Sequence, residues 1–145
     1  MTKDILKEGL EKGWIHARMF FEVMGATEQV AKDALAEHIR KMKKMDNMKI
    51  VAENLGETLR VDDPPKQFKD KEAYSQIADV EIIVSSLENL IYSVIFFGPS
   101  SIEVIEPKEM RIGFDSAQAM ANAVAEIMHR YAAGGAGGIV ISTKK

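Results

Sequence analysis

The chain has 145 residues and no cysteine. That absence excludes thiolate nucleophiles, iron–sulfur ligation, thiol-based zinc sites and disulfide switches. Three histidines remain as candidates for metal binding or acid–base chemistry: His16, His38 and His129. None of them stands in a metal-binding motif such as His-Glu-x-x-His, and His38 shares a helical face with apolar residues. We therefore expect no metal site and no cofactor, and a structural role for His38.

Long apolar runs are also absent. The longest one, around Val94–Phe97, is interrupted by Tyr92 and Ser93 and ends at Gly98, well short of the roughly 20 residues that span a bilayer. Charged residues interrupt every short apolar pair near the N-terminus, so no signal-peptide core is present. With 46% hydrophobic residues and a net charge of −3, the composition predicts a cytoplasmic globular protein without membrane contact.

Hydrophobic periodicity predicts the order helix, helix, strand, strand, helix, strand, helix. The glycines at positions 9 and 13 interrupt the first helical pattern, and Thr27 is a good N-cap for the second helix. A bulge or bend near Gly56 is expected in the first strand. The predicted helices are Lys3–Met24, Thr27–Met45 and Asp115–Tyr131, and the predicted strands are Met48–Val61, Tyr74–Val84 and Ile102–Ile105.

The segment Leu87–Phe97 has two interpretations. Its second part, from Leu90, is rich in β-formers and precedes Gly98-Pro99, as in one arm of a hairpin. Against this, Ser85-Ser86-Leu87-Glu88 is a capping box, and apolar residues recur at helical spacing after it. The cap and the period together favour a helix, whereas a hairpin would make the sheet wholly antiparallel.

These elements predict an α+β fold of ferredoxin-like type: a small mixed sheet with helices packed on one face, preceded by an extra N-terminal helix. The first two strands are expected to be antiparallel neighbours, and Tyr74–Glu106 to form a right-handed parallel crossover. We expect a single domain over residues 1–133. Residues 134–145 are then a Gly-rich tail, or an edge strand through Ile139–Ile141.

Carboxylates are the first candidate for chemistry. Glu81 lies on the second strand, and Glu103 and Glu106 flank the short strand expected beside it. Should the three converge, they could form an acid–base pair of a small enzyme. Alternating carboxylates are, however, common on half-exposed strands, which favours simple projection from an uncovered sheet face.

A basic run forms the second candidate. It extends from Arg40 to Lys49 and includes Lys41 and Lys44. Such a patch could contact nucleic-acid phosphates, but no aromatic residue lies nearby to stack on bases. The sequence pI near 5.7 favours a solvated helix end, so nucleic acid is not the expected partner.

Apolar residues extend around much of the predicted first helix. Trp14, Met19, Phe20 and Phe21 supply more apolar surface than one buried helix face requires. This excess predicts an interface, and a homodimer is the commonest kind of partner.

The stretch from Ser85-Ser86-Leu87-Glu88 to Gly98-Pro99-Ser100-Ser101-Ile102-Glu103-Val104-Ile105-Glu106-Pro107 resembles small uncharacterised archaeal proteins of α+β type. Their pattern is similar: a capped helix, then a strand that ends in Glu-Pro, preceded by a basic helix like Glu37–Met45. The resemblance carries no catalytic motif and supports the helix at Leu87–Phe97. The leading hypothesis is thus a non-enzymatic, self-associating cytosolic module that also binds a small ligand or a protein partner.

Overall fold

The computed structural model describes residues 2–68 and 72–133. These belong to two units, one within Met1–Lys108 and one within Glu109–Lys145, and each unit is described by itself. The expected single domain over residues 1–133 stays a prediction. The expected tail or edge strand at 134–145 lies outside the described residues.

The first unit is built around one four-stranded sheet with the order β2-β3-β1-β4. Every neighbouring pair of strands is antiparallel, and the predicted α+β class is confirmed. A helix joins β1 to β2 and another joins β3 to β4. The elements are α1 (Thr2–Glu11), β1 (Ile15–Gly25), α2 (Glu28–Met42), β2 (Met48–Arg60), the 3-10 helix η1 (Lys66–Phe68), β3 (Tyr74–Val84), α3 (Leu87–Phe97) and β4 (Ser101–Glu106).

The sheet is antiparallel where we predicted a mixed one. The β3 and β4 strands do run parallel to each other, since both are antiparallel to β1. They are not neighbours, however, because β1 lies between them. The connection from β3 through α3 to β4 therefore passes over β1, a strand in the segment that the sequence pattern predicted to be helical.

The long N-terminal helix is the main error of the sequence-based prediction. The extra helix exists as α1, but it ends at Glu11, and Gly13 then adopts φ 83°, a backbone conformation that ends the helix and turns the chain. From Ile15 onward burial alternates, with Ala17, Met19 and Phe21 buried on one side of β1. The side chains between these positions include His16, Arg18 and Glu22, so β1 is apolar toward the core and more polar on its other face, although it lies in the middle of the sheet.

Local capping signals place the two connecting helices as predicted. The Thr27 hydroxyl accepts a hydrogen bond from the backbone N–H of Val30 at 3.1 Å and starts α2. The Ser86 hydroxyl accepts one from the N–H of Asn89 at 3.1 Å and starts α3, which Gly98 ends at φ 59°. The helical interpretation of Leu87–Phe97 is confirmed.

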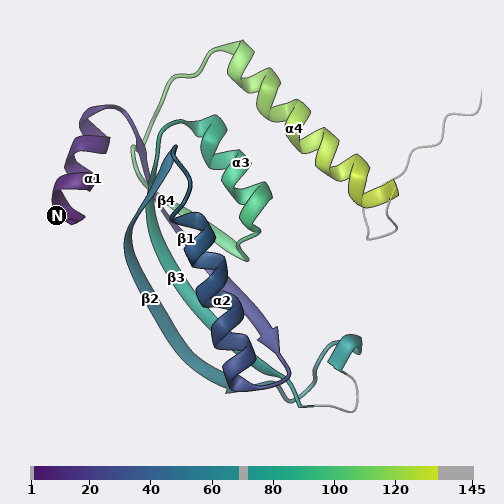
Figure 1. Cartoon of the computed structure of the whole chain (residues 1–145). Helices are drawn as coiled ribbons and strands as arrows, with labels where there is room; N and C mark the ends of the chain where they lie inside the picture. The colour runs from purple at the N-terminus through teal and green to yellow at the C-terminus, as the bar shows by residue number, and fades with distance from the viewer. Residues whose placement is uncertain (1, 69–71, 134–145) are drawn as a thin grey trace, which may run out of the picture. The chain divides into compact units, whose positions relative to one another are not determined.

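The hydrophobic core of this unit lies between the sheet and the two helices α2 and α3. In Figure 1, α2 runs along the sheet on the side from which the picture is taken. Alternate residues of β1 and β3 meet the apolar stripe of α2 and the inner side of α3. The buried side chains include Ala17, Met19, Phe21, Leu35, Ile39, Met42, Val80, Ile82, Val84, Leu90 and Phe97.

The second unit consists chiefly of α4 (Phe114–Ala133), and the predicted final helix is confirmed. None of its described residues is buried. One face of the helix is nevertheless apolar. On this face the residues Val124, Met128 and Tyr131 are 46%, 47% and 53% exposed.

Candidate functional site

The face of the sheet opposite α2 and α3, called the outer face, carries most of the sheet's polar side chains. Because side chains alternate along a strand, the residues between the core positions point to this face. At one end α1 covers it, where the Gly9 backbone lies against the buried side chain of Ile83. The outer-face residues used below are His16, Arg18, Phe20, Glu22, Asn54, Ile77, Asp79, Glu81 and Glu103.

Arg18 lies at the centre of a carboxylate cluster on this face. Its guanidinium is 3.9 Å from Asp79, 3.7 Å from Glu81 and 3.7 Å from Glu103. These distances are ion-pair distances without close hydrogen bonds, and Arg18 Nε is buried with no hydrogen-bond partner. The three acids thus come from β3 and β4 to one cation on β1.

His16 extends the cluster by one further contact. Its Nε2 lies 2.9 Å from Glu81 Oε1, and the histidine side chain is only 9% exposed. Glu106 is the register partner of His16 on β4. Of the predicted carboxylates, the structure brings Glu81 and Glu103 together at Arg18 and places Glu106 opposite His16; an acid–base role for them stays a prediction.

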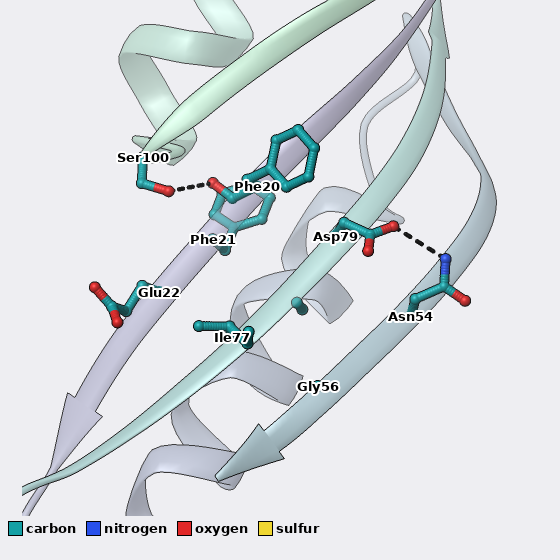
Figure 2. A pocket seen from close by; sticks show the side chains of 9 residues that line it. Phe20, Phe21, Glu22, Asn54, Gly56, Ile77, Asp79 and Ser100 are labelled. Atoms are coloured by element: carbon teal, nitrogen blue, oxygen red, sulfur yellow. Dashed lines mark hydrogen bonds between the residues drawn. The ribbon is translucent and has the colours of Figure 1, made fainter. Parts of the chain in front are cut away.

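A hollow of about 400 Å³ lies further along the outer face (Figure 2). Phe20 and Ile77 supply apolar surface, and Glu22, Asn54 and Asp79 supply polar groups around it. The lining residues are Phe20, Phe21, Glu22, Asn54, Gly56, Ile77, Ala78, Asp79 and Ser100. The predicted enzyme residues Glu81 and Glu103 are not among them.

A bulge in β2 shapes one wall of the hollow. The register between β2 and β3 shifts between Leu55 and Thr58, and the Gln76 side chain donates to the Gly56 carbonyl at 2.6 Å. A Cβ atom at Gly56 would lie 2.6 Å from Ile77 Cγ1, so only glycine lets the two strands approach this closely. The bulge predicted near Gly56 is confirmed.

Hydrogen bonds hold the polar rim in place. Asn54 Nδ2 donates to Asp79 Oδ1 at 3.0 Å, and Ser75 Oγ donates to Glu22 Oε2 at 2.6 Å. Across the hollow from Asn54, Ser100 donates two hydrogen bonds to the Phe20 carbonyl. One comes from its backbone N–H at 2.7 Å and the other from its hydroxyl at 3.0 Å, and Figure 2 shows the second. Rim groups held in this way are positioned before any ligand arrives.

The predicted interface residues occupy three different environments. Met19 and Phe21 are 0% and 4% exposed in the core, which accounts for their apolar character without any partner. Phe20 is half-buried and lines the hollow, and Trp14 is half-buried just before β1. The sequence pattern missed the hollow because a helix assigned to residues 15–24 separates Phe20 from Glu22, whereas a strand places both on one face.

The basic residues Arg40, Lys41 and Lys44 lie exposed at the C-terminal end of α2 and just beyond it. Arg40 Nε donates to Glu37 Oε2 at 2.8 Å, and this hydrogen bond lowers the pKa of Glu37. One of the three predicted phosphate-binding cations is therefore already paired, while a nucleic-acid role for the group stays a prediction.

The described residues contain neither a cluster of metal ligands nor a helix that could span a membrane. Within 2–68 and 72–133, no group of three or more histidine, aspartate or glutamate side chains could hold a metal ion. In the same ranges, the helices are too short or too polar to cross a bilayer.

Comparison with known proteins supports the archaeal resemblance of the sequence. No curated protein and no solved structure matches the chain. The model of the MJ0538 family, named after a protein of the archaeon Methanocaldococcus jannaschii, matches residues 16–138. This range runs from β1 through α4 and contains the outer-face hollow. Because the match covers most of the chain, the protein belongs to the MJ0538 family.

Proposed function

We propose that this protein is a non-enzymatic binding domain whose outer-face hollow holds a small ligand. The observation that carries the proposal is the hollow itself, with apolar surface from Phe20 and Ile77 and a hydrogen-bonded polar rim. Its volume of about 400 Å³ falls in the usual range of small-molecule sites, and a few fixed polar groups around apolar surface are typical of them. Glu81 and Glu103 lie outside the hollow and at ion-pair distance from Arg18. This arrangement favours a binding role of the hollow over carboxylate catalysis.

The order of elements supports the ferredoxin-like type within the α+β class. Without α1 and η1, the first unit reads β1-α2-β2-β3-α3-β4, the split β-α-β arrangement of that type. Both helices contribute to the core on one face of the sheet. In this arrangement the other face is available for a ligand.

The ligand proposal is tested by titrating the full chain with three probes that share a phenyl ring: phenethylammonium, 3-phenylpropionate and 2-phenylethanol. Amide shifts in ¹H–¹⁵N spectra should move at Phe20, Ile77 and Asp79 for at least one probe. Ile77→Trp fills the hollow and should abolish the shifts. Leu59→Trp adds the same ring at an exposed position on β2 outside the hollow lining and should leave them unchanged. If no probe shifts these amides, or if the shifts survive in Ile77→Trp, the proposal is contradicted.

Self-association is a second proposed property, and it rests on the apolar face of α4. This face, the α4 seam, consists of Ala117, Met120, Ala121, Val124, Met128 and Tyr131. Its spacing is nearly symmetrical about Val124, with seam residues three or four and seven positions away on either side. In an antiparallel pair of α4 helices, Ala117 of one copy therefore faces Tyr131 of the other, a small residue opposite a large one.

Charge favours the same antiparallel arrangement. The first turn of α4 carries Asp115 and the last turn carries Arg130, so antiparallel helices bring the acidic end of one copy beside the basic end of the other. The helix dipoles then also oppose each other favourably. A second copy of the chain is the partner that fits these features.

The oligomer is tested by light scattering of the full chain, whose mass is 16.1 kDa. We expect about twice this mass for the wild type and the monomer mass for Val124→Glu, because a charge in the seam is buried without a partner. Asn122→Glu adds the same charge on the other side of α4 and should stay dimeric. A monomeric wild type, or a dimeric Val124→Glu, contradicts this mode of self-association.

A further inference from the structure

We propose that the hollow selects organic cations: a primary ammonium or guanidinium group carried on an apolar arm. This inference rests on the proposed function of the hollow and adds the chemical class of its ligand. It follows from the charges around the hollow, from the partners those charges already have, and from the position of the apolar surface between them.

The charged side chains that line the hollow are both acidic. Glu22 comes from β1 and Asp79 from β3, and the lining contains no lysine, arginine or histidine. A cation entering the hollow meets two carboxylates and no basic side chain in the lining. An anion is repelled by the same two carboxylates. The charge of the lining therefore favours cations over anions, whatever the shape of the ligand.

The two carboxylates differ in how far the protein already neutralises them. Asp79 is 3.9 Å from the Arg18 guanidinium and accepts a hydrogen bond from Asn54. Glu22 accepts a hydrogen bond from the neutral Ser75 hydroxyl. Within residues 2–68 and 72–133, no cationic side chain lies at ion-pair distance from Glu22. Glu22 is therefore the group whose charge a ligand would complement most directly.

Arg18 also explains why the rest of the acidic outer face does not compete for the same ligand. Glu81 and Glu103 share its guanidinium, and Glu81 also contacts His16. These acids already have cationic or hydrogen-bonding partners from the chain itself. The hollow combines apolar surface with Glu22, whose hydrogen-bond partner Ser75 is neutral and which has no cationic partner among the described residues.

The apolar surface of the hollow indicates that the cationic group of the ligand is attached to an apolar arm. Phe20 and Ile77 lie on neighbouring strands, and Figure 2 shows Glu22 and Ile77 on the same part of the face. Glu22 and Ile77 are direct register partners, so a cation at Glu22 places its attached arm over Ile77 and toward Phe20. A bare metal ion would leave this apolar surface uncovered, whereas an alkyl or aryl ammonium covers it.

The experiment compares the affinities of the three phenyl probes for the full chain by the same shift titration. Phenethylammonium should bind at least about tenfold more tightly than 3-phenylpropionate, with 2-phenylethanol between them, because they differ chiefly in charge. Glu22→Gln keeps the size and the acceptor oxygen, and should weaken phenethylammonium about five- to tenfold while leaving 2-phenylethanol within about twofold. The advantage of the cation should shrink at high salt.

Glu103→Gln is the matched control, since it removes the same charge from the same face of the sheet outside the hollow. It should change phenethylammonium affinity by less than about twofold. If the neutral or the anionic probe binds as tightly as the cation, or if Glu22→Gln and Glu103→Gln act alike, the cation proposal is overturned while the hollow remains a ligand site. If none of the probes binds at the hollow, the proposed function is overturned with it.

Discussion

Nε2 of His38 on α2 donates a hydrogen bond of 2.7 Å to the backbone carbonyl of Phe97, the last residue of α3. The last carbonyls of a helix have no partner within the helix, so a histidine from one helix completes the end of the other. The imidazole also packs edge-on against Phe21 and Phe97, with ring centroids 5.3 and 5.6 Å apart. His38 thus joins both helices to the sheet, which confirms its expected structural role.

Replacing His38 with alanine should lower the free energy of unfolding by about 2–3 kcal/mol, because a partly buried hydrogen bond and two ring contacts are lost together. Urea denaturation followed by circular dichroism measures the change. Lys41→Ala, at an exposed position of the same helix, should change the stability by less than about 0.5 kcal/mol. Equal effects of the two substitutions contradict the role assigned to His38.

Gly9→Ala should destabilise the protein although alanine is the better helix former. In an exposed helix this change stabilises by up to about 1 kcal/mol. Here the added methyl group overlaps the buried Ile83 side chain, whose Cγ1 would be 2.9 Å away, and overpacking typically costs about 1–3 kcal/mol. Thermal unfolding measures the sign. The double variant Gly9→Ala, Ile83→Val should recover part of the loss, and a stabilised Gly9→Ala would show that α1 does not pack on Ile83.

Arg18→Ala should make stability depend on salt. Without the guanidinium, Asp79, Glu81 and Glu103 face one another without their shared counter-ion, and like charges at short range destabilise the fold by about 1–2 kcal/mol at low ionic strength. Added NaCl should restore part of this loss because it screens the repulsion. Arg60→Ala is the control, because this arginine of the same unit pairs with Glu72 and not with the cluster. A salt dependence equal to that of the wild type contradicts the shared-cation arrangement.

Tyr74 offers a test that depends on pH. The Tyr74 hydroxyl donates to Glu72 Oε2 at 2.9 Å, and this hydrogen bond raises the pKa of Tyr74 above its ordinary value of 10.0. A raised pKa favours the protonated phenol in the folded state, so its contribution to stability is complete below pH 10 and is lost as the pH rises through the raised pKa.

Glu72→Gln removes the charge of the acceptor, so the pKa of Tyr74 should fall toward 10.0. Absorbance at 295 nm follows the titration once Tyr92→Phe and Tyr131→Phe leave Tyr74 as the remaining tyrosine of three. Glu53→Gln, whose carboxylate pairs with Lys43, should leave the pKa of Tyr74 unchanged. A pKa that does not move in Glu72→Gln contradicts the contribution of this hydrogen bond.

Local patterns were sufficient for most elements because each carries its own signal. The strand Tyr74–Val84 was predicted with the bounds that β3 has, since apolar and polar residues alternate along it. The helix at Leu87–Phe97 was predicted because a serine cap and a helical period agree, although its β-rich composition favoured a strand. In both cases the information lies within a dozen neighbouring residues.

Local patterns were not sufficient to decide between a helix and a strand for the segment Ile15–Gly25. Its apolar residues satisfy a helical spacing and a strand spacing together, because Phe20 and Met24 stand between the core positions of the strand, Met19, Phe21 and Val23. What decides between the two is the pairing of β1 with β3 on one side and β4 on the other, and these partners lie 49 to 90 positions further along the chain. The error at this segment also produced the predicted mixed sheet and the helical assignment of Met19, Phe20 and Phe21, while the interface predicted at Trp14, Met19, Phe20 and Phe21 stays a prediction.

The sequence by itself determined the α+β class, the capped helices, the bulge near Gly56 and the exclusion of cysteine chemistry, because these depend on residue types and on neighbours along the chain. Only the tertiary structure decided that β1 lies between β3 and β4, that Arg18 gathers three acids, and that Glu22 and Asp79 face one hollow. The reason is physical: strand pairing joins residues that are distant in sequence, and the hollow is lined by residues that β1, β2 and β3 bring together.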